Sequence, residues 1–116
     1  MEIPEKRLSK RLKVNLPLNF ERLGATKYSG ETVIKDISVT GIRINLDTFS
    51  PTNTNFLLKI RLPEVNKVIE GLARIVWANR VSYSDRYQAG LQFYEMNTIF
   101  RKWLEEYILI NETLSR

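Results

Sequence analysis

Residues 56–80 read FLLKIRLPEVNKVIEGLARIVWANR and contain the clearest structural signal in the chain. In residues 56–62 every second position is apolar: Phe56, Leu58, Ile60 and Leu62. Lys59 and Arg61 lie between them, so the segment has the period of a β-strand with one wet face. PEVNK is a short hairpin connection, and residues 68–80 return as a long strand with a bend or bulge expected at Gly71. The stretch predicts an antiparallel β-hairpin.

The same period of two recurs outside this hairpin. It predicts four more strands, over residues 14–21, 31–38, 42–47 and 87–94. Pro17 has no N–H, so we expect the first strand at a sheet edge or with Pro17 on its unpaired side. After residue 96 the period lengthens to about 3.6, which predicts an amphipathic helix over residues 97–111 with Asn97 or Thr98 as its cap. Short antiparallel strands and frequent turns indicate an all-β fold with a terminal helix, as a small barrel or a sandwich, with the helix closing one open end.

Length and composition limit the possible classes of protein. A chain of 116 residues forms one domain, and 43% hydrophobic with 27% charged residues is typical of a soluble globular protein. No apolar run reaches the roughly 18 residues of a spanning helix, and the N-terminus has no secretion signal, so we expect a cytoplasmic protein with no membrane insertion.

The absence of two residue types limits the catalytic and metal-binding chemistry that the chain can support. The sequence has no Cys and no His, which removes disulfides, thiolate nucleophiles, imidazole bases and nearly every zinc site. The neighbouring Glu105 and Glu106 diverge on the predicted helix and resemble a solvated face rather than an acid/base pair. We therefore expect no catalytic residues, no metal and no cofactor.

Positive charge is concentrated at the N-terminus. The net charge is +5, and the first thirteen residues hold five cations against two acids, which places +3 of it there. These cations are Lys6, Arg7, Lys10, Arg11 and Lys13. We expect residues 1–13 to form a flexible basic arm that attracts a phosphate-bearing partner. The plainer interpretation is a solvated arm that aids solubility.

The sequence contains two short motifs that differ in how often they would arise by chance. Arg7 and Arg11 form RxxxR, which arises about once per shuffled sequence of this composition. Asp36, Ser38 and Gly41 form DxSxxG in DISVTG, which arises in roughly one shuffle in a hundred. The second motif is therefore the informative one, although Asp36 and Ser38 are also common in a turn that caps a strand end.

With both motifs in this order, the chain resembles PilZ domains, the bacterial receptor modules for cyclic di-GMP. The resemblance extends to GLARIVW (71–77), YQAGLQF (87–93) and FRKWLEEYI (100–108), and so runs almost end to end. It implies a six-stranded antiparallel β-barrel over residues 14–95, a C-terminal helix and no catalysis. It also implies that the motif residues bind the ligand: Arg7, Arg11, Asp36, Ser38 and Gly41. Val39 and Thr40 precede Gly41 where many relatives have a glycine beside it, which affects only loop flexibility.

The chemistry of these residue types suits a guanine dinucleotide. An arginine fork pairs with guanine O6/N7 or with phosphate, and its plane stacks on a base. Asp36 can accept from guanine N1–H and N2–H, a donor edge that adenine lacks. The Ser38 hydroxyl can reach a phosphate or base atom, and Gly41 allows a tight turn and a close approach of ligand to backbone.

Four further residues are weaker ligand candidates. Lys6 and Lys10 adjoin the RxxxR arginines, and Lys6 has a possible influence on whether one ligand or a stacked pair is bound. Trp77 is expected mainly to pack the core or its rim, with guanine contact as the alternative, and Arg74 is the weakest candidate. Trp103 and Tyr107 are expected to pack the helix on the barrel.

The resulting hypothesis is a cyclic di-GMP receptor whose arm folds across the barrel on binding and changes the surface presented to a downstream protein. Two alternatives stay open. One is a general single-stranded nucleic-acid binder, since small basic barrels with exposed aromatics bind such strands. The other is a ligand-free PilZ-like adaptor that acts by protein contact.

Overall fold

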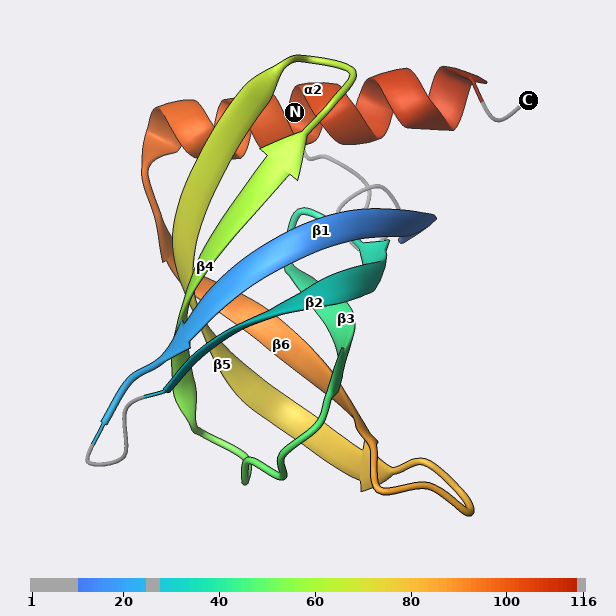
Figure 1. Ribbon diagram of the computed structural model, residues 1–116. Helices are drawn as coiled ribbons and strands as arrows, with labels where there is room; N and C mark the ends of the chain where they lie inside the picture. The colour runs from blue at the N-terminus through green and yellow to red at the C-terminus, as the bar shows by residue number, and fades with distance from the viewer. Residues whose placement is uncertain (1–10, 25–27, 115–116) are drawn as a thin grey trace.

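The computed structural model describes residues 11–24 and 28–114, which form a six-stranded barrel and one helix (Figure 1). The elements are β1 (Leu12–Arg22), β2 (Tyr28–Ile37), β3 (Gly41–Leu46), β4 (Asn55–Leu62), β5 (Lys67–Arg80), β6 (Tyr87–Met96) and α2 (Thr98–Leu114). The strands close in the order β1-β2-β3-β6-β5-β4, and all neighbours are antiparallel. The predicted six-stranded antiparallel barrel with a C-terminal helix is confirmed, and the sandwich alternative is excluded.

The β4–β5 hairpin is built as its sequence predicts. Its register runs without a shift from Asn55 opposite Arg74 to Leu62 opposite Lys67. The alternating apolar residues of both strands are buried in the barrel: Phe56, Leu58, Ile60, Leu62, Ile69, Ala73 and Ile75. The Asn66 N–H donates to the Pro63 carbonyl across 3.1 Å to close the connecting turn. Because the turn fixes the register, the alternating apolar side chains face the core, while Val68 and Val76 lie on the outer face.

Two register shifts interrupt the ladder between β5 and β6. The register shifts between Leu72 and Ala73, next to the expected bend at Gly71, and again between Ile75 and Trp77. The second shift inserts one residue, so Ile75 is buried while Val76 and Trp77 are both exposed. The core packing expected of Trp77 is therefore not observed, since its ring lies on the outside of the barrel.

The first strand is paired on both sides. Its ladder with β2 spans Leu12 to Arg22, and its ladder with β4 begins at Leu18 opposite Ile60. Of the two expectations, the edge strand is wrong because barrel closure removes that edge, whereas the unpaired side at Pro17 is confirmed. Pro17 lies just before the β4 ladder begins, where its missing N–H is tolerated. Strand structure begins at Leu12, two residues before the expected barrel boundary, and ends at Met96.

Helix α2 crosses one end of the barrel beside the β4–β5 turn (Figure 1). The Asn97 side chain caps it, accepting the Ile99 N–H at 2.8 Å, and the helix extends three residues beyond the expected end. Leu104, Tyr107 and Ile108 are buried against the barrel. None of the helical segments within the described residues has the length and apolarity needed to cross a membrane.

Candidate ligand-binding site

The turn DISVTG joins β2 to β3 and is organised by Ser38. The Ser38 Oγ accepts the backbone N–H groups of Thr40 at 3.1 Å and Gly41 at 3.2 Å. The Ser38 N–H donates to the Gly41 carbonyl at 2.9 Å, and the side chain is fully buried. The serine turn considered from the sequence is thus present. The Ser38 side chain is therefore not accessible to a ligand in this structure.

Gly41 is needed for space rather than for its backbone conformation. Within the described residues Gly24 is the one glycine with positive φ, so Gly41 is not in the left-handed region. A Cβ at Gly41 would lie 2.1 Å from the backbone oxygen of Leu91. The glycine therefore allows β3 to approach β6, in addition to bordering the cavity described below.

Asp36 of β2 joins two arginines: Arg11, which directly precedes β1, and Arg43 of β3. Its Oδ1 accepts from Arg11 Nε and its Oδ2 from Arg43 Nε, each at 2.6 Å. The Asp36 side chain is only 14% exposed. Burial by itself would raise the pKa of this carboxyl, but the hydrogen bonds and charges of Arg43 and Arg11 outweigh it and hold the pKa below its usual value. Asp36 is thus ionised at neutral pH and fixes the orientation of both guanidinium groups.

Arg43 was missed by the sequence reasoning. It follows Gly41 by two residues, and it alternates with the buried Ile42 and Ile44, which places its side chain on the outer face. Asp36 and Arg43 flank the turn and are direct cross-strand partners. An acid and a base flanking a hairpin turn, both on the polar face, is a signal that could have identified the pair.

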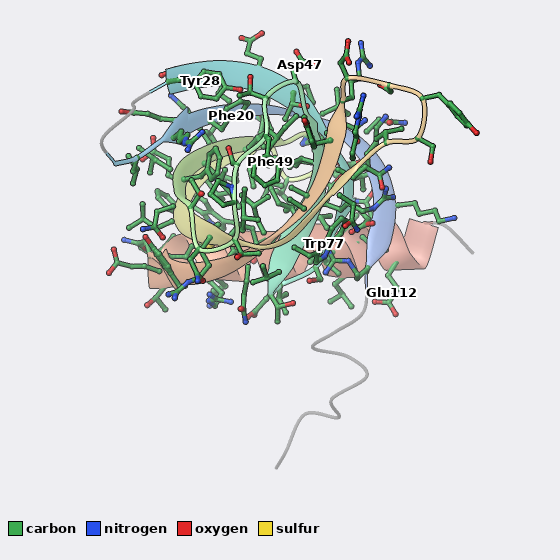
Figure 2. The ribbon with its side chains drawn as sticks, turned by 90° about the horizontal axis from the view of Figure 1, so that it is seen from below. Phe20, Tyr28, Asp47, Phe49, Trp77 and Glu112 are labelled. Atoms are coloured by element: carbon green, nitrogen blue, oxygen red, sulfur yellow. The ribbon has the colours of Figure 1, made fainter. Side chains whose placement is uncertain are left out.

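A continuous row of cross-strand neighbours explains how the site assembles. Asp36 on β2 pairs with Arg43 on β3, Arg43 pairs with Gly90 on β6, and Gly90 pairs with Trp77 on β5. The Trp77 ring, labelled in Figure 2, covers Gly90 so closely that a Cβ there would lie 2.1 Å from the indole Nε1. The glycine thus provides the surface against which the indole lies.

This row borders a cavity of about 430 Å³ on the outside of the barrel. Its lining residues are Arg11, Asp36, Thr40, Gly41, Ile42, Arg43, Val76, Trp77, Gly90, Leu91 and Gln92. Two arginines and one aspartate are the charged members, so the lining carries a net charge of +1. An arginine pair beside an exposed indole suits a flat base linked to a phosphate.

The structure gathers four of the predicted site residues around this cavity: Arg11, Asp36, Gly41 and Trp77. Ser38 does not line it, and neither does Arg74, whose guanidinium lies 4.5 Å from the centroid of the Tyr94 ring. Lys6, Arg7 and Lys10 fall outside the described residues.

A comparison with family models matches the PilZ domain over residues 5–109. The chain belongs to the PilZ domain family. The comparison with curated protein sequences gave no match.

Solved structures share this PilZ fold. The Bacillus subtilis inhibitor of motility (MotI/DgrA) superposes with a TM-score of 0.75 at 23% identity, over 91% of this chain and 50% of that one. MrkH of K. pneumonia in its apo state superposes with a TM-score of 0.71 at 18% identity, over 99% of this chain and 53% of that one. The PilZ domain of YcgR from Escherichia coli, solved with c-di-GMP, superposes with a TM-score of 0.67 at 15% identity, over 92% of each chain. This chain spans about half the length of the first two proteins.

Proposed function

We propose that this PilZ-family chain is a non-catalytic receptor for cyclic di-GMP. The observation that carries the proposal is that one cavity brings together Arg11, which precedes β1, with Asp36, Arg43 and Trp77 from three separate strands. Family membership and the ligand named with the YcgR structure favour the same dinucleotide.

The arginines are oriented for a second partner. Asp36 occupies the Nε atoms of Arg11 and Arg43, and Arg11 Nη1 also approaches Ser38 Oγ at 3.4 Å. Within the described residues no hydrogen bond is seen from the Nη atoms of Arg43. These donors are the ones that pair bidentately with phosphate or with guanine O6/N7. Asp36 therefore positions both forks, and its second lone pairs stay available for the guanine N1–H and N2–H groups.

The indole of Trp77 supplies a stacking surface in the proposed complex. It is 37% exposed and borders the cavity. Base–aromatic stacking contributes about 1–3 kcal/mol per base, comparable to one charge-assisted hydrogen bond. In the proposed complex one guanine stacks on Trp77.

The N-terminal cations complete the proposed mechanism. Arg11 already contacts the DxSxxG turn, and Arg7 precedes it by one RxxxR spacing. In this proposal Arg7, with Lys6 and Lys10 beside it, folds over the bound dinucleotide and neutralises its two phosphates. The bound state thereby presents a new surface to a downstream protein.

The decisive experiment is calorimetry with cyclic di-GMP, its adenine analogue and linear guanine dinucleotide, preceded by a thermal-shift screen. Only cyclic di-GMP should bind and stabilise. Arg11→Ala should weaken binding roughly 10- to 150-fold, since one charge-assisted contact is lost. Arg61→Ala removes an exposed cation of β4 outside the cavity and should change affinity little. Equal affinity of Arg11→Ala and the wild type contradicts the arginine-clamp mechanism.

The same titrations separate the alternatives. A general nucleic-acid binder should accept any base and lose affinity steeply with salt, whereas a dinucleotide receptor has a shallow salt dependence. No heat and no thermal shift with any nucleotide would indicate the ligand-free adaptor.

A further inference from the structure

Arg101 connects the C-terminal helix to the DxSxxG turn. It lies in the first turn of α2, and its Nη1 donates to the Val39 carbonyl at 3.0 Å, across 62 positions of the chain. Helix α2 passes over the end of the barrel at which β2 turns into β3 (Figure 1). Within residues 11–24 and 28–114, this is the one hydrogen bond between the helix and residues 38–41.

The position of Arg101 is unfavourable for the helix itself. The N-terminal end of a helix carries partial positive charge, so a cation in the first turn is destabilising. No acidic residue lies in that turn, and in the described part of the chain no carboxylate forms an ion pair with Arg101. Proteins tend to break such local rules where a residue has a functional role. The acceptor that Arg101 does reach is the Val39 carbonyl.

The peptide group between Val39 and Thr40 is held at both of its polar ends. Its carbonyl accepts from Arg101, and its N–H donates to Ser38 Oγ at 3.1 Å. The C=O and N–H of a trans peptide point in opposite directions, so the two bonds together fix the rotation of the peptide plane. The next carbonyl, that of Thr40, accepts the Phe93 N–H at 2.9 Å. The turn is thus held from the helix, from β6 and by its own serine.

The same peptide group adjoins the wall of the ligand cavity. Thr40 and Gly41 line that cavity, whereas Val39 and Arg101 do not. The Gly41 N–H donates to the same Ser38 Oγ that accepts from Thr40. Rotation of the peptide between Val39 and Thr40 would therefore disturb both lining residues together. A wall that is fixed before the ligand arrives needs no ordering on binding, and this favours affinity.

We propose that Arg101 is a positioning residue for the ligand-binding turn, through which helix α2 sets the affinity of the cavity. Arg101 acts through the Val39 carbonyl and does not touch the ligand. Its effect on affinity rests on the proposed function, whereas its hold on the turn does not. Because linkage is reciprocal, a ligand that needs the positioned turn stabilises the contact between α2 and the turn, and displacement of the first turn of α2 lowers the affinity for the ligand.

The test compares Arg101→Met with Lys102→Met in the whole chain. Methionine keeps an unbranched apolar stem and lacks the donor. Lys102 is the matched control, because it is exposed, carries the same charge at the same end of the helix, and its side chain has no hydrogen bond or ion pair within the described residues. By calorimetry with cyclic di-GMP, Arg101→Met should bind at least about fivefold more weakly than the wild type, and Lys102→Met within about twofold of it.

Amide hydrogen exchange separates positioning from a general loss of stability. In Arg101→Met the amides of Thr40 and Gly41 should exchange at least about tenfold faster than in the wild type, whereas that of Ile60, whose strand is paired on both sides, should change much less. Equal acceleration of all three amides, or none, overturns the proposal. This measurement needs no ligand, so a wild type that does not bind cyclic di-GMP contradicts the proposed function and leaves the hold of Arg101 on the turn to be decided by exchange.

The wild type provides the test if circular dichroism shows that Arg101→Met does not fold. In NMR spectra of arginine side chains, the Cζ–Nη1 bond of Arg101 should rotate more slowly than that of Arg61, which is exposed on β4. Equal rotation in the two guanidinium groups overturns the proposal. It is also overturned if folded Arg101→Met binds cyclic di-GMP as tightly as the wild type, or if Lys102→Met loses as much affinity as Arg101→Met.

Discussion

Gly90→Ala tests whether the position of the Trp77 indole sets the affinity for the dinucleotide. A Cβ at Gly90 would lie 2.1 Å from Nε1, 2.5 Å from Cε2 and 2.8 Å from Cδ1 of Trp77. All three atoms belong to the ring, so the ring and not the backbone must move. Restoring ordinary contact at 3.4 Å requires a displacement of more than 1 Å. We expect the variant to fold and to present the indole in the wrong place.

The expected loss follows from stacking. If the guanine stacks on Trp77, misplacing the ring removes most of the stacking free energy, which is about 1–3 kcal/mol. A loss of that size corresponds to roughly 5- to 150-fold weaker binding. Trp77→Ala should lose a similar amount. Since both changes remove the same interaction, the double variant should bind about as weakly as Trp77→Ala alone.

Isothermal titration calorimetry with cyclic di-GMP measures the Kd of the wild type, of Gly90→Ala, of Trp77→Ala and of the double variant, which together form a double-mutant cycle. Gly30→Ala is the matched control, because a Cβ there meets the Phe20 ring at 2.8 Å, away from the ligand cavity. It should leave Kd unchanged. Wild-type affinity in Gly90→Ala, or strictly additive losses in the double variant, would refute the idea that Gly90 holds Trp77 in its binding position.

Three further predictions follow from the site. Arg43→Ala should weaken cyclic di-GMP binding roughly 10- to 150-fold by calorimetry, and an unchanged Kd would remove Arg43 from the site. Gly41→Ala should lower the free energy of unfolding by about 2–4 kcal/mol in urea titrations, because its Cβ meets the Leu91 carbonyl at 2.1 Å; wild-type stability would contradict that contact. Asp36 has a depressed folded pKa, so its ionised form stabilises the fold above the unfolded pKa of about 3.9, and this stability is lost as pH falls through the folded value. The difference in unfolding free energy between wild type and Asp36→Asn should be present at pH 7 and should shrink as the pH falls below about 3.9; a difference independent of pH would exclude the ion pairs as its cause.

Much of the fold follows from local pattern. The period of two in residues 56–62 and the change to 3.6 after residue 96 indicate a strand and a helix because each depends only on neighbouring residues. The Asn97 cap could be predicted for the same reason. The serine turn at Ser38 was also foreseen as one possibility, since its bonds reach only two or three residues along the chain.

Register and closure were not visible in the sequence. Pro17 suggested either an edge strand or an unpaired side at Pro17, and closure decided for the second, because β1 is paired with β4 only from Leu18 onward. The extra residue between Ile75 and Trp77 is set by the match between β5 and β6, and it places Trp77 on the outer wall and not in the core or at its rim, as was mainly expected. A single-residue shift exchanges the faces of a strand, and no local pattern specifies it.

By itself the sequence determined which segments are strands or helix, which faces are apolar, and that RxxxR and DxSxxG are present. Only the tertiary structure decided that Arg11 meets Asp36, 25 residues away, and that Arg43, Gly90 and Trp77 continue the same row across three more strands. The reason is physical: side-chain alternation is a property of a single strand, whereas the neighbours across a barrel are set by pairing among all six.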